Sequence, residues 1–216
     1  MNPASKAVGA LLALGLVAAT AVGAWYVVRE IGPGFLPDRC EATVGGRTVE
    51  LTPEQAENAG LIAAIGVRRG LPARAVSIAL ATAYQESGIR NLTTGDRDSL
   101  GLFQQRPSQG WGTKREVTDP VHATNAFYDA LVEIEGYRDL PITEAAQAVQ
   151  RSAFPEAYAD HEDDARALAS ALTGNSRAAF HCEVPGTAEA ADARLGGNGL
   201  TPRAEDVRAE AVAVFG

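Results

Sequence analysis

The chain has few of the residues that bind metals or nucleic acids. Among its 216 residues are 2 cysteines and 3 histidines, and His122, His161 and His181 have no metal-ligand spacing to one another or to the cysteines. The net charge is −8, and no basic cluster exceeds Arg68-Arg69, which argues against a nucleic acid as partner. We therefore expect neither a metal nor a cofactor.

Long hydrophobic runs are also scarce, with one exception near the N-terminus. Residues 7–28 include no charged side chain, and a helix of this length spans roughly 33 Å, enough to cross the hydrocarbon core of a bilayer. We expect residues 1–6 at the cytoplasmic end, a transmembrane anchor over 7–28, and the rest on the extracytoplasmic side. A signal peptide cleaved near Ala19-Thr20-Ala21 is the alternative, and it sends the domain to the same side as a secreted protein.

The two cysteines, Cys40 and Cys182, lie on either side of nearly the whole remaining domain. In an oxidising compartment such a pair is most simply a disulfide. We therefore expect a bridge that ties together the two ends of the domain.

Residues 29–49 have the composition of a linker followed by a β-hairpin. Gly45-Gly46 separates two short β-prone runs, Ala42–Val44 and Arg47–Leu51, which predicts a two-residue turn between paired strands. The stretch Ala179–Cys182 is a candidate third strand that returns to this hairpin.

The main domain is predicted over residues 50–174 and is mostly helical. Helix starts and stops are marked by capping residues, prolines and glycines. The expected helices are Thr52 to about Arg69, Pro72 to Ser87, Asp119 to about Glu135, Thr143 to Ser152, and Pro155 to about Thr173. Between Gly88 and Val117 no helical period holds, and such a long irregular segment inside a domain is usually functional.

Two segments follow the main domain. Residues 175–200 are rich in Gly, Ala and Asp and are expected to be flexible. Residues 201–216 begin with Thr201-Pro202 and have the pattern of an amphipathic helix. This helix either docks on the main domain or is the first element of a truncated second domain.

The helix that begins after Pro72 has a carboxylate on its apolar side. Apolar residues recur along it at i, i+3, i+4 and i+7, while Arg74, Ser77 and Gln85 occupy the opposite side. Glu86 continues the edge of the apolar stripe. A carboxylate there is costly unless it is paired or protonated, and a protonated carboxylic acid is what a general acid needs. Escape of the side chain to water at the last helical turn is the alternative.

Glu86-Ser87, a polar loop with glycine, and Gly101-Leu102-Phe103-Gln104 follow one another along the chain. They resemble the Glu-Ser … Gly-Leu-Met-Gln signature of the lysozyme-like superfamily, and in particular of the soluble lytic transglycosylases. The longer run from Gly95 to Gly112 is similar to a version seen in actinobacterial cell-wall proteins. The resemblance covers roughly residues 50–174. It implies a mainly α, lysozyme-like domain with a small β-hairpin and a loop-rich cleft, and it implies peptidoglycan glycan strands as the partner.

The resemblance also implies roles for individual residues. Glu86 would protonate the glycosidic oxygen between N-acetylmuramic acid and N-acetylglucosamine, and Ser87 would fix the adjoining loop. Leu102 and Phe103 are expected in the core. The expected substrate-binding residues are Ser87, Gly101, Gln104, Gln105, Gln150 and Tyr158.

The family's later Ala-Tyr-Asn-Ala-Gly motif is poorly kept at residues 148–152. Gln150 is a candidate replacement for the Asn, but Val149 removes the Tyr that stands beside the acid in the family. Tyr158 and Tyr84 are the candidates for the missing hydroxyl.

The number of carboxylates decides between two chemistries. A glycoside hydrolase usually needs two, about 5 or 6.5–9.5 Å apart, and Asp96 and Asp98 are candidates for the second. A lytic transglycosylase uses one glutamate, first as acid and then as base, and releases a 1,6-anhydro sugar. We expect the one-glutamate enzyme. A muramidase-type hydrolase and a non-catalytic peptidoglycan-binding module are the alternatives, and no protein partner is indicated.

Overall fold

The computed structural model describes residues 38–152, 155–183, 196–197, 205–209 and 212. The predicted transmembrane segment 7–28 and most of the predicted helix over 201–216 lie outside the described residues, although residues 205–209 are helical. Among the described residues, no helix combines the length and the apolar character that crossing a membrane requires.

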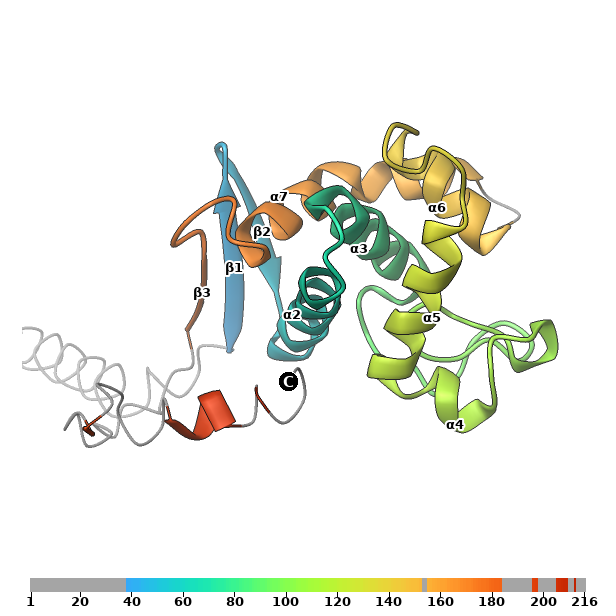
Figure 1. Cartoon of the computed structure of the whole chain (residues 1–216), viewed down its shortest axis with the longest axis horizontal. Helices are drawn as coiled ribbons and strands as arrows, with labels where there is room; N and C mark the ends of the chain where they lie inside the picture. Colours follow the sequence, from blue (N-terminus) through green and yellow to red (C-terminus); the bar gives the residue numbers. More distant parts are fainter. Residues whose placement is uncertain (1–37, 153–154, 184–195, 198–204, 210–211, 213–216) are drawn as a thin grey trace, which may run out of the picture. The chain divides into compact units, whose positions relative to one another are not determined.

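Helices dominate the described part of the chain, and they are accompanied by a small antiparallel sheet (Figure 1). The expectation of a mainly α domain is therefore confirmed. The elements are β1 (Arg39–Val44), β2 (Arg47–Leu51), α2 (Pro53–Arg68), α3 (Ala73–Ser87), η2 (Pro107–Gln109), α4 (Lys114–Val117), α5 (Pro120–Val132), α6 (Ile142–Gln150), η3 (Pro155–His161), α7 (Glu162–Leu172) and β3 (Phe180–Glu183).

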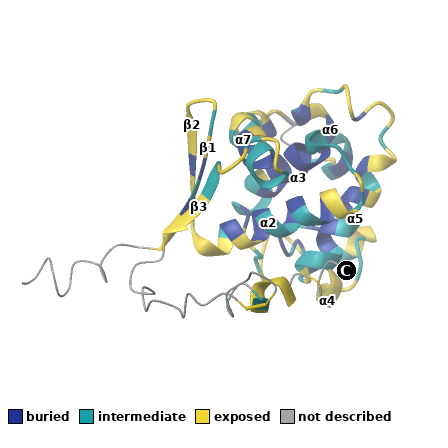
Figure 2. Ribbon diagram, turned by 60° about the vertical axis from the view of Figure 1, so that its left-hand side comes forward, coloured by how far each residue is buried: buried dark blue, intermediate teal, exposed yellow. Residues whose placement is uncertain are grey.

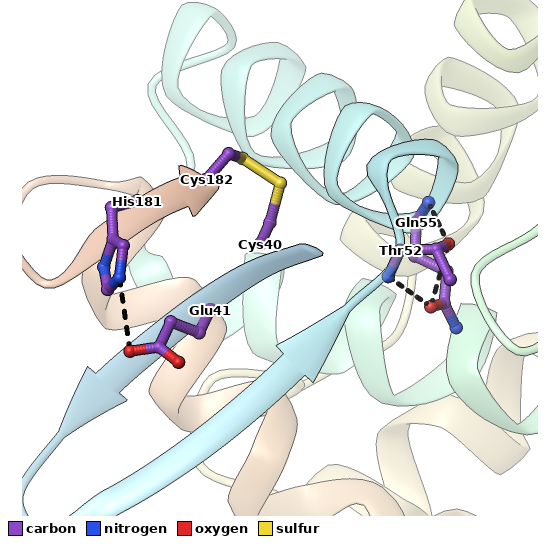
Figure 3. The surroundings of a disulfide bond; sticks show 6 residues. All are labelled: Cys40, Glu41, Thr52, Gln55, His181 and Cys182. Atoms are coloured by element: carbon purple, nitrogen blue, oxygen red, sulfur yellow. Dashed lines mark hydrogen bonds and ion pairs between the residues drawn. A yellow bond between two sulfur atoms is a disulfide. The ribbon is translucent and has the colours of Figure 1, made fainter. Parts of the chain in front are cut away.

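The sheet has the strand order β2-β1-β3, with both pairs antiparallel. The hairpin turns at Gly45 and Gly46, whose φ angles of 60° and 83° suit glycine and match the twist of the flanking strands. The candidate third strand is present as β3, which pairs with β1 so that Glu41 lies opposite His181. Their side chains approach to 3.3 Å (Figure 3).

The predicted disulfide joins Cys40 to Cys182 across the β1–β3 pair (Figure 3). Cys40 is buried against the core, whereas Cys182 is exposed on the last strand. The bond links positions 142 residues apart in sequence, so it closes a loop that contains every helix from α2 to α7.

Helix α2 begins where the sequence predicts it. The Thr52 side chain accepts a hydrogen bond from the Gln55 backbone N–H, and the Gln55 side chain accepts one from the Thr52 N–H (Figure 3). This capping box satisfies two N–H groups that would otherwise lack partners at the helix start. The helix ends at the C-cap residue Arg69, also as expected.

Helix α3 is the centre of the domain. It contacts α2, α5, α6, α7 and η3, and every residue from Ala75 to Ala83 is buried (Figure 2). The expected polar side is therefore wrong for Ser77. Its hydroxyl and that of Thr82 donate to carbonyl oxygens one turn earlier in the same helix, so burial leaves neither hydroxyl unsatisfied.

Several elements differ from the expectation. Thr143 does not cap α6, because the helix already begins at Ile142 after Pro141. Pro155 opens a 3-10 segment, η3, and the α-helix α7 begins only at Glu162. The short helix α4 was not predicted, although a capping box of Thr113 and Glu116 marks its start.

Removing the disulfide should destabilise the domain strongly. For replacement of Cys40 and Cys182 by Ser together, the chain-entropy model gives a loss of about 5 kcal/mol in the free energy of unfolding. Guanidinium chloride denaturation of the oxidised protein, the reduced protein and the double variant measures this loss. Equal midpoints for the oxidised and reduced protein would contradict it.

Candidate active site

Glu86 lies in the last turn of α3, just before the chain leaves the helix. Gly88 ends the helix in the left-handed conformation, with φ 63°. The Glu86 side chain is half-buried and lines an open cavity of about 520 Å³. The cavity lining also includes four other residues predicted for the site, namely Asp96, Gln104, Gln105 and Gln150. Ser87, Asp98, Gly101 and Tyr158 are not part of it.

Among the described residues, the Glu86 carboxylate has one hydrogen-bond partner, the hydroxyl of Tyr158. This hydroxyl donates to Glu86 Oε1 at 2.7 Å. Tyr158 is fully buried in η3, and its pKa is raised far above the ordinary value by burial and by the negative charge of Glu86. The hydroxyl therefore keeps its proton and remains a donor that orients the carboxylate.

Tyr84, the other candidate for this hydroxyl, has a different position. Its ring stacks on the imidazole of His161, with the centroids 4.9 Å apart and an interplanar angle of 8°. It is half-buried and does not line the Glu86 cavity. Of the two tyrosines, only Tyr158 contacts the carboxylate.

Ser87 fastens the irregular segment to the end of α3. Its hydroxyl lies 2.7 Å from the carbonyl oxygen of Leu102 and 3.0 Å from that of Ala83, and it accepts a hydrogen bond from the Arg90 N–H. Ser87 thus braces the loop and does not line the cavity.

Gly101 also has a structural role, in the packing of the backbone. Its φ angle is 78°, its N–H donates to Leu92 O at 2.7 Å, and a Cβ at this position would lie 2.0 Å from Val117 O. The absent side chain therefore permits close contact with α4, and not with the cavity. Leu102 and Phe103, which follow it, are fully buried, as expected.

The three predicted glutamines all line the cavity. Their amide nitrogens donate to backbone carbonyls: Gln104 to Gly101, Gln105 to Ala123 and Gln150 to Phe103. Gln105 is 2% exposed, and its Oε1 has no hydrogen-bond partner among the described residues. The Gln105 oxygen is itself buried. Gln104 and Gln150 each keep a second side-chain N–H as well as a side-chain oxygen, so these two glutamines can bind a ligand's hydroxyl or N–H groups.

The two candidate second carboxylates differ sharply. Asp98 lies outside the Glu86 cavity, and its oxygens accept from the Ser108 N–H, from Arg106 Nε and from the Ser108 hydroxyl. These bonds hold its pKa well below the ordinary range, so Asp98 is a loop anchor. Asp96 is exposed and lines the cavity with Glu86, at 3.9 Å from Arg97 Nε.

The cavity includes residues that sequence reasoning missed. Trp111 contributes an indole from the irregular segment, and Arg151 contributes a cation directly after Gln150. In the sequence, Trp111 was marked only by its place beside Gly112, at the end of the run that resembles the cell-wall proteins. Arg151 was marked only by its place after Gln150. In the described part of the chain, no group of three or more His, Cys, Asp and Glu side chains is arranged to hold a metal ion.

Comparison with known proteins adds no assignment to this geometry. No protein-family model matches the chain, and no curated protein matches it. The function is therefore argued from the site.

The contribution of the close contact at Gly101 to stability can be measured by comparison with Gly88, a glycine of similar backbone conformation. Gly101→Ala should cost about 3 kcal/mol of stability, because a left-handed alanine costs about 1 kcal/mol and the overlap with Val117 O adds about 2 kcal/mol. Gly88→Ala, where φ is 63° but nothing lies within 4 Å of the added Cβ, should cost only about 1 kcal/mol. Equal losses in urea denaturation would show that the Val117 contact is unimportant.

Proposed function

We propose that the protein cleaves peptidoglycan glycan strands between N-acetylmuramic acid and N-acetylglucosamine, as a one-glutamate lytic transglycosylase of lysozyme-like fold. The observation that carries this proposal is the hydrogen bond from Tyr158 to Glu86 at the edge of an open polar cavity. The bond gives one carboxyl group a fixed orientation, as general acid catalysis requires. The Cys40–Cys182 disulfide supports a location outside the cytoplasm, and the residue pattern at 7–28 supports a membrane anchor there.

In the first step, Glu86 donates its proton to the glycosidic oxygen as the bond to the muramic C1 breaks. The Tyr158 hydroxyl occupies Oε1, so the transferred proton is carried on Oε2. As the proton leaves, charge develops on the carboxylate, and the same hydroxyl stabilises that charge.

In the second step, the Glu86 carboxylate takes a proton from the muramic 6-hydroxyl. The 6-oxygen then attacks C1 and closes the 1,6-anhydro ring, which restores the acid form of Glu86. No water is consumed, and a single carboxyl group serves both steps.

The walls of the cavity suit an N-acetylated sugar. The side-chain amides of Gln104 and Gln150 can exchange hydrogen bonds with sugar hydroxyls and acetamido groups. The Trp111 indole offers an apolar face on which a pyranose ring can pack.

A hydrolase that uses Asp96 is the second candidate. Asp96 lines the same cavity as Glu86, so it is the described candidate that could activate water there. The strong hydrogen bonding of Asp98 removes the other candidate from this role.

The first experiment is digestion of purified peptidoglycan, followed by mass analysis of the released fragments. Wild-type protein should release 1,6-anhydro ends, each one water lighter than its hydrolytic counterpart. Glu86→Gln should reduce release about 1,000-fold, because it removes the transferable proton and retains the side-chain shape. Glu57→Gln, the same change on an exposed part of α2, is the matched control and should be fully active.

The other outcomes separate the alternatives. Reducing ends that disappear in Asp96→Asn would support hydrolysis. Binding of glycan by the wild type without any release would leave a non-catalytic binding module.

The Tyr158 hydroxyl can be tested with a conservative change. Tyr158→Phe should lower kcat about 10- to 100-fold with little change in KM, since a hydrogen bond to a charged group contributes about 1.5–3 kcal/mol. Tyr84→Phe removes the same atom from a tyrosine without contact to Glu86 and should leave kcat unchanged. Comparable losses in both variants would mean that the Tyr158–Glu86 bond has no catalytic importance.

A further inference from the structure

A second cavity, of about 670 Å³, opens next to the Glu86 cavity. The two linings share Gln109, Trp111, Gln150 and Arg151, so the cavities adjoin at these residues. Glu86 lines only the first of them. The cleavage chemistry proposed above therefore leaves the second cavity without a role.

The lining of the second cavity differs in character from that of the first. Ala130, Ile134 and Val149 give it an apolar surface, and Glu133 and Arg151 are its charged residues. Both charged side chains are exposed, and within the described ranges neither of them forms an ion pair. The cavity thus offers an apolar surface together with one available anion and one available cation.

The backbone holds Arg151 at the junction of the two cavities. It is the C-cap of α6, with φ 52° and ψ 41°, and its N–H donates to Gln147 O at 2.8 Å. Glycine adopts this left-handed conformation more readily than any other residue. A long cationic side chain in a strained position, where two cavities meet, points to an anionic group on the ligand.

We propose that the second cavity binds the peptide substituent of a glycan strand, with Arg151 pairing with a peptide carboxylate. This assignment rests on the proposed function. A strand of N-acetyl sugars offers mainly hydroxyl and acetamido groups, whereas its short peptides add small apolar side chains, amino groups and carboxylates. The apolar lining suits the side chains, Glu133 suits an amino group, and the planar Arg151 guanidinium can bind a carboxylate through two parallel N–H bonds.

An NMR titration of the full-length Glu86→Gln protein tests this proposal without cleavage of the ligand. The probes are N-acetylmuramic acid with an Ala-Glu dipeptide, the same compound with both carboxyl groups amidated, and N-acetylmuramic acid alone. The free-carboxylate dipeptide should bind about 10-fold more tightly than its amidated form, as expected for one charge-assisted pair. Arg151→Gln should abolish this difference.

Arg97→Gln is the matched control. Arg97 is also exposed and left-handed, with φ 56°, but it lines only the first cavity. The 10-fold ratio should persist in this variant. The comparison of free and amidated ligands in the Arg151-containing protein needs no substitution at Arg151, so it remains informative if Arg151→Gln fails to fold.

The titration and the digestion separate the two proposals. Equal binding of the free and amidated dipeptides, or an Arg151-dependent gain for the sugar alone through its lactyl carboxylate, would overturn the peptide assignment. In that case, strand cleavage by the wild type would still support the proposed function. An Arg151-dependent preference for the free dipeptide without any strand cleavage would establish the peptide site and refute the proposed cleavage.

Discussion

The burial of α3 is the constraint on which the rest of this domain depends. Because α2, α5, α6, α7 and η3 all pack against this helix, its position is fixed from every side. Glu86 stands one turn beyond the fully buried stretch, where the packing ends and the cavity begins. A rigid helix that terminates at a cavity holds a side chain more accurately than a loop does, and acid catalysis needs that accuracy.

The irregular segment after α3 gains its order from contacts with the helices. Ser87 ties Leu102 O to the end of α3, and Gly101 lets the backbone approach α4. Phe103 then enters the core and stacks on Phe127 of α5, with 4.7 Å between the ring centroids. Ser87 and Gly101, which the motif suggested as substrate-binding residues, therefore hold the irregular segment against the helices.

Local signals predicted the local structure. The capping box at Thr52, the Gly45-Gly46 turn and the two cysteines each act over short range or allow one simple pairing, so residue types sufficed. Contacts between residues far apart in the sequence were harder to predict. The hydroxyl beside Glu86 comes from a tyrosine 72 residues away and left two candidates open, while Arg151 had no pattern that marked it. The prediction that Ser77 lies on a polar, exposed side of α3 was wrong, because its hydroxyl forms a hydrogen bond within the helix and can therefore be buried.

The pairing of the first and last strands has a mechanical consequence. Arg39 at the start of β1 lies opposite Glu183 at the end of β3, with an ion pair of 2.7 Å, and the disulfide lies one residue inward. Tension applied through the flanking chain therefore passes from one strand to the other through a covalent bond. The helices stay outside this load path, so tension on the ends of the domain would leave the geometry around Glu86 undisturbed.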